Sequence, residues 1–264
     1  GRYNTTTTSY LKDICTTPKQ SLSRQRCRRL ISLFPKHSFS VPVDASSITP
    51  DVFAKKSVHE IKSLPFWEGN RRRILDDLFE VNQEEAVAGE EITIRLVGDL
   101  SKAKRIGARA SFGRIVVEGN AGMRLGEEMR GGAITVTGNA DSWAGMMMTS
   151  GRIEIIGDAG DYVASAYRGS TEGMKGGTIL IRGNAGSEVG CYMGNGFIRV
   201  QGNIGLLTGM RMRDGAILVG GDSEGRPGAE MLGGRIIVLG HVPSILPTFS
   251  IDSIRKSARA GDET

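Results

Sequence analysis

The chain has 264 residues and a formal net charge of +5, and 37 of its residues are glycine. This length is enough for one or two domains with a full hydrophobic core. The first 36 residues hold eight Lys or Arg and one Asp, so the rest, with 26 basic and 28 acidic residues, is nearly neutral, which argues against nucleic-acid binding.

Cysteine content and hydropathy exclude two further classes of protein. Cys15, Cys27 and Cys191 form neither a disulfide framework nor a paired metal-binding motif, which favours a reducing compartment. No apolar run approaches the roughly 18 residues that a membrane span requires. We therefore expect a cytoplasmic protein with no membrane contact.

Residues 1–35 form a basic extension that is rich in Thr, Ser and Arg. The stretch from Ser23 to Phe34 could fold as a short amphipathic helix. Three interpretations stay open: a targeting peptide, an arm that lies on an acidic partner, or an extension with no role of its own.

Residues 36–90 are not repetitive, and we expect them to cap the N-terminal end of the repeat that follows, because an open solenoid end exposes backbone groups. Thr49 and Pro50 predict the start of a helix that runs from about Asp51 to Lys62. The other expected elements are an edge strand at 39–44, a turn at 66–70, a strand at 73–81 and an acidic connector at 82–91.

Residues 91–241 repeat with a period of 19. Each unit opens at a Gly followed by Asn, Asp or His, at positions 98, 119, 138, 157, 183, 202, 221 and 240. Each unit also holds an alternating pair such as Ile134 and Val136, which predicts a short strand with one buried face. Units this short bury their apolar faces only by stacking. We predict an all-β fold, a right-handed parallel β-helix of seven to eight coils from about Ile92 to Gly240.

Side chains one period apart should stack in columns. The inward columns are Ile134, Ile153, Ile179, Ile198, Ile217 and Ile236; Ala121, Ala140, Ala159 and Ala185; and Met129, Met174, Met193, Met212 and Met231. A further row consists of Asn120, Asn139, Asp158, Asn184, Asn203 and Asp222. This row could suggest calcium, but its 19-residue period and its neutral amides favour side-chain stacking or turn capping.

One coil is seven residues longer than the others, and we assign the extra residues to Ser165–Thr171. An insertion cannot enter a solenoid core, so it should bulge from one face. It offers Tyr162, Tyr167, Arg168 and Glu172 as a candidate partner interface, since Tyr and Arg are enriched at interface hot spots. A tolerated surface loop is the alternative.

The sequence shows no catalytic, cofactor-binding or metal-binding pattern. His37, His59 and His241 lie far apart, and Cys191 has no basic neighbour that would activate a thiolate. After Gly240, two prolines break the repeat, and 242–264 should form a C-terminal cap with a short helix from Ile251 to Ala260.

Five stretches carry a resemblance to a known family. They are GNAGSEVGCYMGNGFIRVQGN (183–203), the pair GNADSWAG and GDAGDYVASAYRG, and the leading TPDVFAKKSVHEIKSLPFWEGN with LDDLFEV. Together they resemble the C subunit of formylmethanofuran dehydrogenase over about residues 38–241. The gamma subunit of formyltransferase/hydrolase complexes and the C-terminal domain of glutamate synthase share the glycine repeat alone. Ala164 departs from the pattern, because other coils have Gly at its position.

The resemblance implies a function that an assembly performs. A partner subunit similar to formate dehydrogenase would reduce CO2 to formate at a tungsten- or molybdenum-pterin site supplied by iron–sulfur clusters. An amidohydrolase-like subunit with a dinuclear, zinc-type site would condense formate with methanofuran. Small additional and polyferredoxin subunits would complete the complex. The C subunit would be the scaffold between the two catalytic subunits and would hold no cofactor.

Two alternatives stay open. One is the gamma subunit of a formyltransferase/hydrolase complex without redox chemistry. The other is a stand-alone β-helix that binds or hydrolyses carbohydrate, although only 6% of the residues are aromatic.

Overall fold

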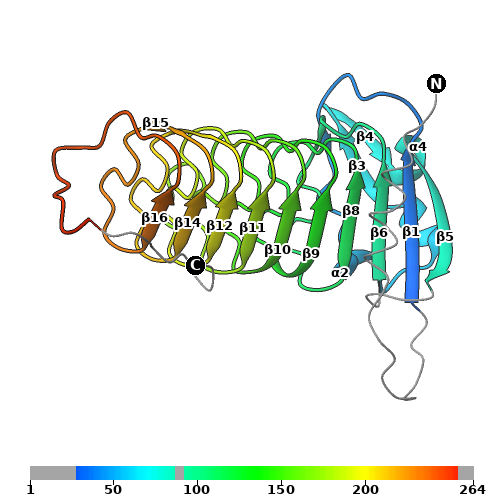
Figure 1. The fold of residues 1–264 in the computed structure, drawn as a ribbon. Helices are drawn as coiled ribbons and strands as arrows, with labels where there is room; N and C mark the ends of the chain where they lie inside the picture. Colours follow the sequence, from blue (N-terminus) through cyan, green and yellow to red (C-terminus); the bar gives the residue numbers. More distant parts are fainter. Residues whose placement is uncertain (1–27, 87–91, 255–264) are drawn as a thin grey trace, which may run out of the picture.

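The structure, a computed structural model, describes residues 28–86 and 92–254. It is a parallel β-helix whose coils stack along one axis, with a small cap of strands and short helices at the N-terminal end (Figure 1). The predicted fold class is confirmed. Among the described residues, no helix is long and apolar enough to cross a membrane.

A ten-stranded sheet runs the length of the molecule. Its strands, in spatial order, are β5 (Phe79–Ala86), β1 (Arg28–Pro35), β6 (Ile92–Val97), β8 (Arg114–Glu118), β9 (Arg130–Val136), β10 (Ser150–Ile155), β11 (Thr178–Ile181), β12 (Phe197–Val200), β14 (Ala216–Val219) and β16 (Arg235–Val238). Neighbours are parallel, except that β5 is antiparallel to β1. The eight strands from β6 to β16 are those that the repeat predicts.

A second, shorter row of pairing lies at another side of the coils. It contains β13 (Ile204–Leu206) and β15 (Ser223–Gly225), which pair in parallel. Single bridges extend it toward the cap through Ala185, Ala159, Ala140, Ala121 and Leu100. The predicted alanine column is therefore where one coil hydrogen-bonds the next.

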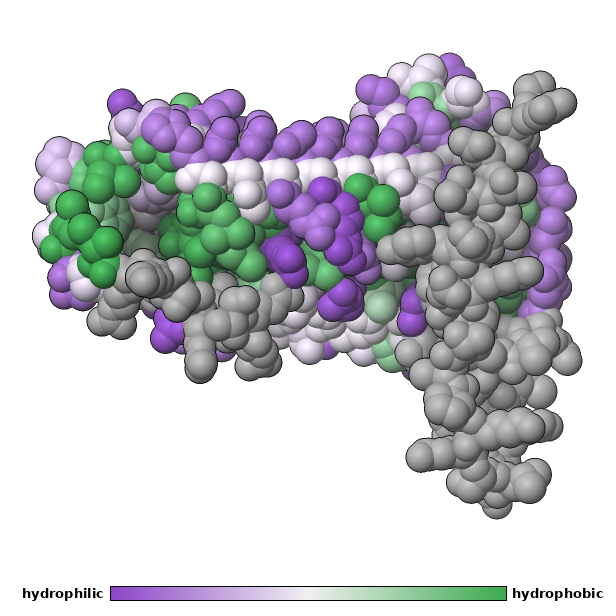
Figure 2. Space-filling model, in the orientation of Figure 1, coloured by the Kyte–Doolittle hydropathy of each residue, from purple (hydrophilic) through white to green (hydrophobic). Residues whose placement is uncertain are grey.

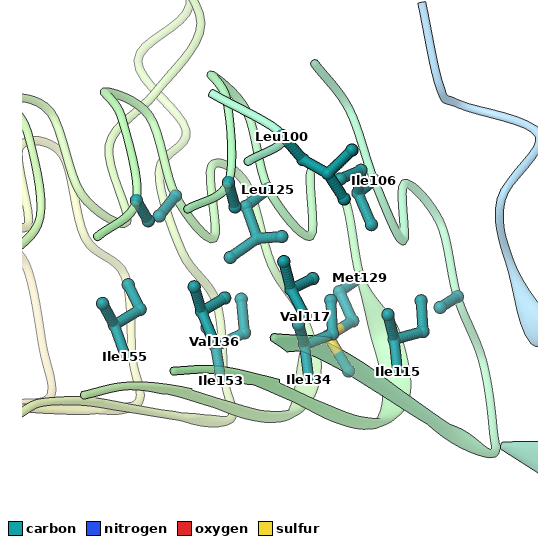
Figure 3. Close-up of a cluster of buried hydrophobic side chains, with 14 of the residues drawn as sticks. Leu100, Ile106, Ile115, Val117, Leu125, Met129, Ile134, Val136, Ile153 and Ile155 are labelled. Atoms are coloured by element: carbon teal, nitrogen blue, oxygen red, sulfur yellow. The ribbon is translucent and has the colours of Figure 1, made fainter. Parts of the chain in front are cut away.

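The core is a set of stacked apolar columns. Figure 3 shows Ile115, Ile134 and Ile153 side by side in successive coils, next to Val117 and Val136. The predicted isoleucines are fully buried from Ile134 to Ile217, whereas Ile236 in the last strand is only partly buried. The methionine column also includes the buried Met148, whereas Met231 in the last coil is only partly buried.

The outer surface repeats as the core does. In Figure 2 a straight row of hydrophilic residues follows the upper side of the coils, with a paler row directly beside it. Rows of this kind are expected where equivalent positions of successive coils carry similar residues. One face of the molecule therefore looks much the same from coil to coil.

The Asn/Asp row is a ladder of hydrogen bonds between coils. The side-chain Oδ1 of each member accepts a bond from the backbone N–H one coil further on. For example, Asn139 N–H donates to Asn120 Oδ1 at 2.9 Å, and Asp158 N–H donates to Asn139 Oδ1 at 2.8 Å. The pattern continues to His241 N–H, which donates to Asp222 Oδ1. The row is therefore a stack of side chains between coils, which is one of the two roles that its period and neutral amides favoured.

The cap holds a four-stranded sheet and three short helices. The sheet order is β4 (Arg71–Ile74), β3 (Pro65–Glu68), β2 (Val43–Asp44) and β7 (Ala103–Lys104), and the helices are α2 (Pro50–Phe53), α3 (Val58–Lys62) and α4 (Leu75–Leu78). Thr49 caps α2 with Pro50 at its first position, as expected. The single helix over 51–62 was wrong, because Ser57 starts α3 with its own capping box.

Two further expectations for the N-terminal part were wrong. Arg28–Pro35 is a strand, not a helix, and it lies between β5 and β6 with Ile31 and Leu33 fully buried. The strand expected over 73–81 is divided by α4, and β5 extends into the connector. Residues 23–27 of the expected helix lie outside the described residues.

The C-terminal end is covered by an incomplete extra coil. Ser223 N–H donates to the His241 carbonyl at 3.0 Å, and Arg226 N–H donates to the Ser244 carbonyl at 2.9 Å. The chain then leaves the coil, and Phe249 lies against Gly228. Residues 251–254 are irregular, and the rest of the helix expected there lies outside the described residues.

Candidate partner interface

One corner of each coil has an unusual backbone that sets the direction of its side chains. Three alternate residues take left-handed angles, for example Trp143 (φ 63°), Gly145 (66°) and Met147 (55°). This conformation costs free energy at residues other than glycine, and hydrogen bonds between coils offset the cost. Trp143 N–H, for instance, donates to the Asp161 carbonyl at 2.8 Å.

The middle position of this corner has little room for a side chain. A Cβ on Gly126 would lie 2.6 Å from Cδ1 of Ile153, one coil further on. Ala164 stands at the same position with φ 62° and is fully buried. The coil with the insertion is thus the one that accepts a methyl group at this corner.

The hydrogen bonds between coils place the insertion in the chain. Ala166 N–H donates to the Cys191 carbonyl, as Met147 N–H does to the Ser165 carbonyl one coil earlier, so Ala166 is a regular coil position. Ser165 is also regular, since it is 1% exposed. The seven extra residues are therefore Tyr167–Gly173, and the assignment to Ser165–Thr171 was wrong by two positions.

Trp143 and Tyr162 form the base on which the inserted loop lies. Their rings stack with centroids 4.7 Å apart and an interplanar angle of 8°. They stack because they occupy the same corner position in successive coils, 19 residues apart. The Tyr162 hydroxyl lies close to the Glu188 carboxylate, and the negative charge of Glu188 raises the pKa of that hydroxyl.

The loop folds back over this aromatic row. The Arg168 guanidinium lies 5.7 Å from the Trp143 ring centroid, and the Arg124 guanidinium lies 5.3 Å from that of Tyr167. Tyr167 nevertheless remains 49% exposed, and Arg168 is exposed. The contacts fix the direction of the loop while leaving an aromatic ring and a cation accessible.

A hollow of about 220 Å³ lies between the loop and the coil corners. Ser165, Ala166, Glu188, Cys191 and Tyr192 are among the residues that line it. Burial and the charge of Glu188 raise the pKa of the Cys191 thiol to about 11, so the thiol is protonated and a poor nucleophile at neutral pH.

The structure unites three of the four residues predicted from the insertion. Tyr162, Tyr167 and Arg168 line one hollow together with Trp143, whereas Glu172 makes a separate ion pair with Lys175 at 2.7 Å. That hydrogen bond lowers the pKa of Glu172. Trp143 and Arg124 were missed, although the 19-residue spacing between Trp143 and Tyr162 was available in the sequence.

No group of three or more His, Cys, Asp or Glu side chains that could hold a metal occurs within 28–86 and 92–254. The corner surface offers aromatic rings, exposed cations and a shallow hollow. These features suit contact with another protein better than they suit bond-making chemistry.

Comparisons with known proteins identify relatives over most of the chain. It is 48% identical over 219 residues to the C subunit of the tungsten-containing formylmethanofuran dehydrogenase 2 of Methanococcus maripaludis, covering 83% of this chain and 79% of that protein. A 93-residue stretch is 46% identical to the corresponding tungsten-enzyme protein of Methanothermobacter wolfeii and 42% identical to its molybdenum-enzyme counterpart from Methanosarcina barkeri. No family model matches.

The extent of these matches differs among the relatives. The matched stretch spans about a third of the Methanothermobacter wolfeii and Methanosarcina barkeri proteins. A solved structure, the formyltransferase/hydrolase complex FhcABCD from Methylorubrum extorquens with methylofuran, contains a chain that superposes with a TM-score of 0.75 at 34% identity. That alignment covers 82% of this chain and 79% of the other.

Proposed function

Because this chain belongs to the family of formylmethanofuran dehydrogenase C subunits, we propose that it is the β-helical scaffold of such a complex. In this proposal the assembly reduces CO2 to formate and condenses formate with methanofuran. The chain holds together a formate dehydrogenase-like subunit, with a tungsten- or molybdenum-pterin and iron–sulfur clusters, and an amidohydrolase-like subunit with a dinuclear, zinc-type site. It carries neither catalytic residue nor cofactor and works in the cytoplasm.

The observation that carries the proposal is the 48% identity over 83% of the chain, since that match includes non-repetitive sequence as well as glycine repeats. A repeat alone could match by its period, but the match requires agreement outside the period too. The architecture also suits a scaffold. A stack of coils that hydrogen-bond one another at several sides is stiff, and stiffness keeps two bound subunits at a fixed separation.

We further propose that the inserted loop contacts one of the catalytic subunits. The regular coils resemble one another, so a partner gains specificity from the irregular loop. Tyr162, Tyr167, Arg168 and Glu172 remain the proposed contact residues, now with Trp143 beneath them. Tyr167 and Arg168 are the exposed anchors, and Tyr162 acts by supporting the loop.

Metal analysis of the purified assembly tests the proposed function. The full chain, tagged and expressed beside its chromosomal neighbours, should bring down large partner subunits together with tungsten or molybdenum and with iron. A chain that purifies alone as a monodisperse monomer and hydrolyses a polysaccharide would overturn the scaffold proposal in favour of a carbohydrate-active β-helix.

The second candidate is the gamma subunit of a formyltransferase/hydrolase complex. The superposition on the FhcABCD chain supports it, although the identity of 34% is lower than the 48% to the dehydrogenase protein. Partner subunits that contain zinc, but neither tungsten, molybdenum nor iron, would establish this candidate instead.

A further inference from the structure

The β3–β4 hairpin of the cap presents an outward face that the fold itself does not use. Alternation along β3 sends Phe66 into the core, where it is 1% exposed, and leaves Trp67 outside at 51% exposure. On β4, Ile74 is 42% exposed. Trp67 is opposite Arg72, and Pro65 is opposite Ile74, so these four side chains share one face. We call them the hairpin face.

The charges of the hairpin are unbalanced. Arg71 and Arg72 are exposed, and neither has an ion pair with a described residue. Two neighbouring cations do have partners: Arg73 pairs with Glu68 at 3.2 Å, and Lys62 pairs with Asp76 at 3.4 Å. Glu68, the register partner of Arg71, is thus already occupied by Arg73.

Position makes this face accessible. β4 is the edge strand of the four-stranded sheet and pairs only with β3 among the described residues. Figure 1 shows β3 and β4 at the capped end of the molecule, away from the coil that holds the inserted loop. A protein bound to the hairpin face could therefore coexist with one bound to the loop.

We propose that the hairpin face is a second docking site, for an acidic segment of a partner subunit. Trp and Arg are enriched at interface hot spots, and a guanidinium without a counter-ion, such as that of Arg72, favours a carboxylate, which it binds in bidentate geometry. The inference rests on the proposed function, because it requires a partner subunit.

The experiment compares complexes purified through the tagged full chain from cells that express all subunits. Arg72→Glu reverses one unpaired charge, and Trp67→Ala removes the exposed indole. Arg130→Glu is the matched control, because Arg130 is also exposed and without an ion pair among the described residues. Each variant is assayed for the amount of every partner subunit retained at increasing NaCl concentration.

We expect Arg72→Glu and Trp67→Ala each to lower retention of one partner subunit by about tenfold, and Arg130→Glu to leave it unchanged. Arg72→Lys should retain that partner more than Arg72→Glu does, and circular dichroism should show that the exposed substitutions leave the fold intact. If Trp67→Ala fails to fold, the two Arg72 variants decide the matter alone.

Unchanged retention in Arg72→Glu, while the wild type still binds its partners, would overturn the hairpin site and leave the scaffold function standing. A wild type without any partner would instead contradict the proposed function. RNA that co-purifies with the wild type and is lost in Arg72→Glu would assign the face to nucleic acid and overturn the inference.

Discussion

Two deletions of seven residues distinguish the register of the inserted loop in the structure from the register assigned by sequence. Removing Tyr167–Gly173 joins Ala166 to Met174, which reproduces the succession of coil positions one coil earlier. Removing Ser165–Thr171 gives a coil of the same length, but places Glu172 where Ser165 was. The two variants therefore differ at two neighbouring positions: Gly173 replaces Ala166 and, with the larger expected effect, Glu172 occupies the buried position of Ser165.

The expected difference follows from the surroundings of that position. Ser165 is 1% exposed. In an earlier coil the same position holds Glu127, whose carboxylate is bound by Arg105 at 2.7 Å. The corner residue that would face Glu172 after the deletion is Trp143, which carries no charge. An unpaired buried carboxylate should cost about 3–5 kcal/mol of unfolding free energy. Removing Tyr167–Gly173 forfeits two exposed cation–π contacts, roughly 1 kcal/mol in total, and the solvent-exposed Glu172–Lys175 ion pair.

Urea unfolding of both full-length variants, followed by circular dichroism, measures this difference. We expect the 167–173 deletion to unfold close to the wild type and the 165–171 deletion to unfold at clearly lower urea. Equal midpoints, or the reverse order, would refute the placement of the insertion. The 167–173 variant also tests the loop as an interface: full assembly without the loop would show that it is a passive bulge.

Three more predictions concern buried positions. Gly126→Ala should lower the free energy of urea unfolding by about 2 kcal/mol, because residue 126 has a left-handed φ and a Cβ there would contact Ile153. Ala164 shows that this corner position can hold a methyl group, so a loss above about 4 kcal/mol would contradict the prediction. The Thr208 hydroxyl is buried without a hydrogen-bond partner, so Thr208→Val should raise the unfolding free energy by about 1 kcal/mol, and a lower melting temperature would contradict this. Folding raises the pKa of the Cys191 thiol from 9.0 to about 11. Between pH 9 and 11 the thiol is therefore protonated in the native state and deprotonated in the unfolded chain. Stability should therefore fall by up to about 2–3 kcal/mol from pH 9 to 11 in the wild type relative to Cys191→Ala, and parallel pH curves would rule this out.

The repetitive part of the fold could be predicted because its signal recurs. Eight strands, the alanine and isoleucine columns and the role of the Asn/Asp row all follow from one 19-residue period. β1 could not be predicted in this way, because its sequence does not belong to the repeat and occurs only once in the chain. Its clustered arginines suggest a helix surface, and only the pairing of Arg28–Pro35 with strands that follow much later in the chain makes it a buried strand.

The candidate interface was predicted in part for a similar reason. The extra length located the loop and, with it, Tyr162, Tyr167 and Arg168, because length is visible in the spacing of glycines. The two-residue error arose because the spacing of the glycines does not show at which position of the coil the inserted residues begin. That choice depends on which backbone groups bond to the next coil, as Ala166 does to Cys191. Trp143 contributes from a coil of ordinary length, so an analysis of irregularities overlooks it.

Because the coils stack at a uniform spacing, the protein fixes the distance between sites on its surface. Parallel strands lie about 4.8 Å apart, so each coil moves whatever follows it by that step. A surface in the cap and a surface on a later coil are thus held at a separation set by the number of units between them. Duplication or loss of one 19-residue unit would shift the two by a single step while leaving each surface intact. The distance between two attachment sites in this fold can therefore change in steps of one coil, through gain or loss of repeat units, without any change to the sites themselves.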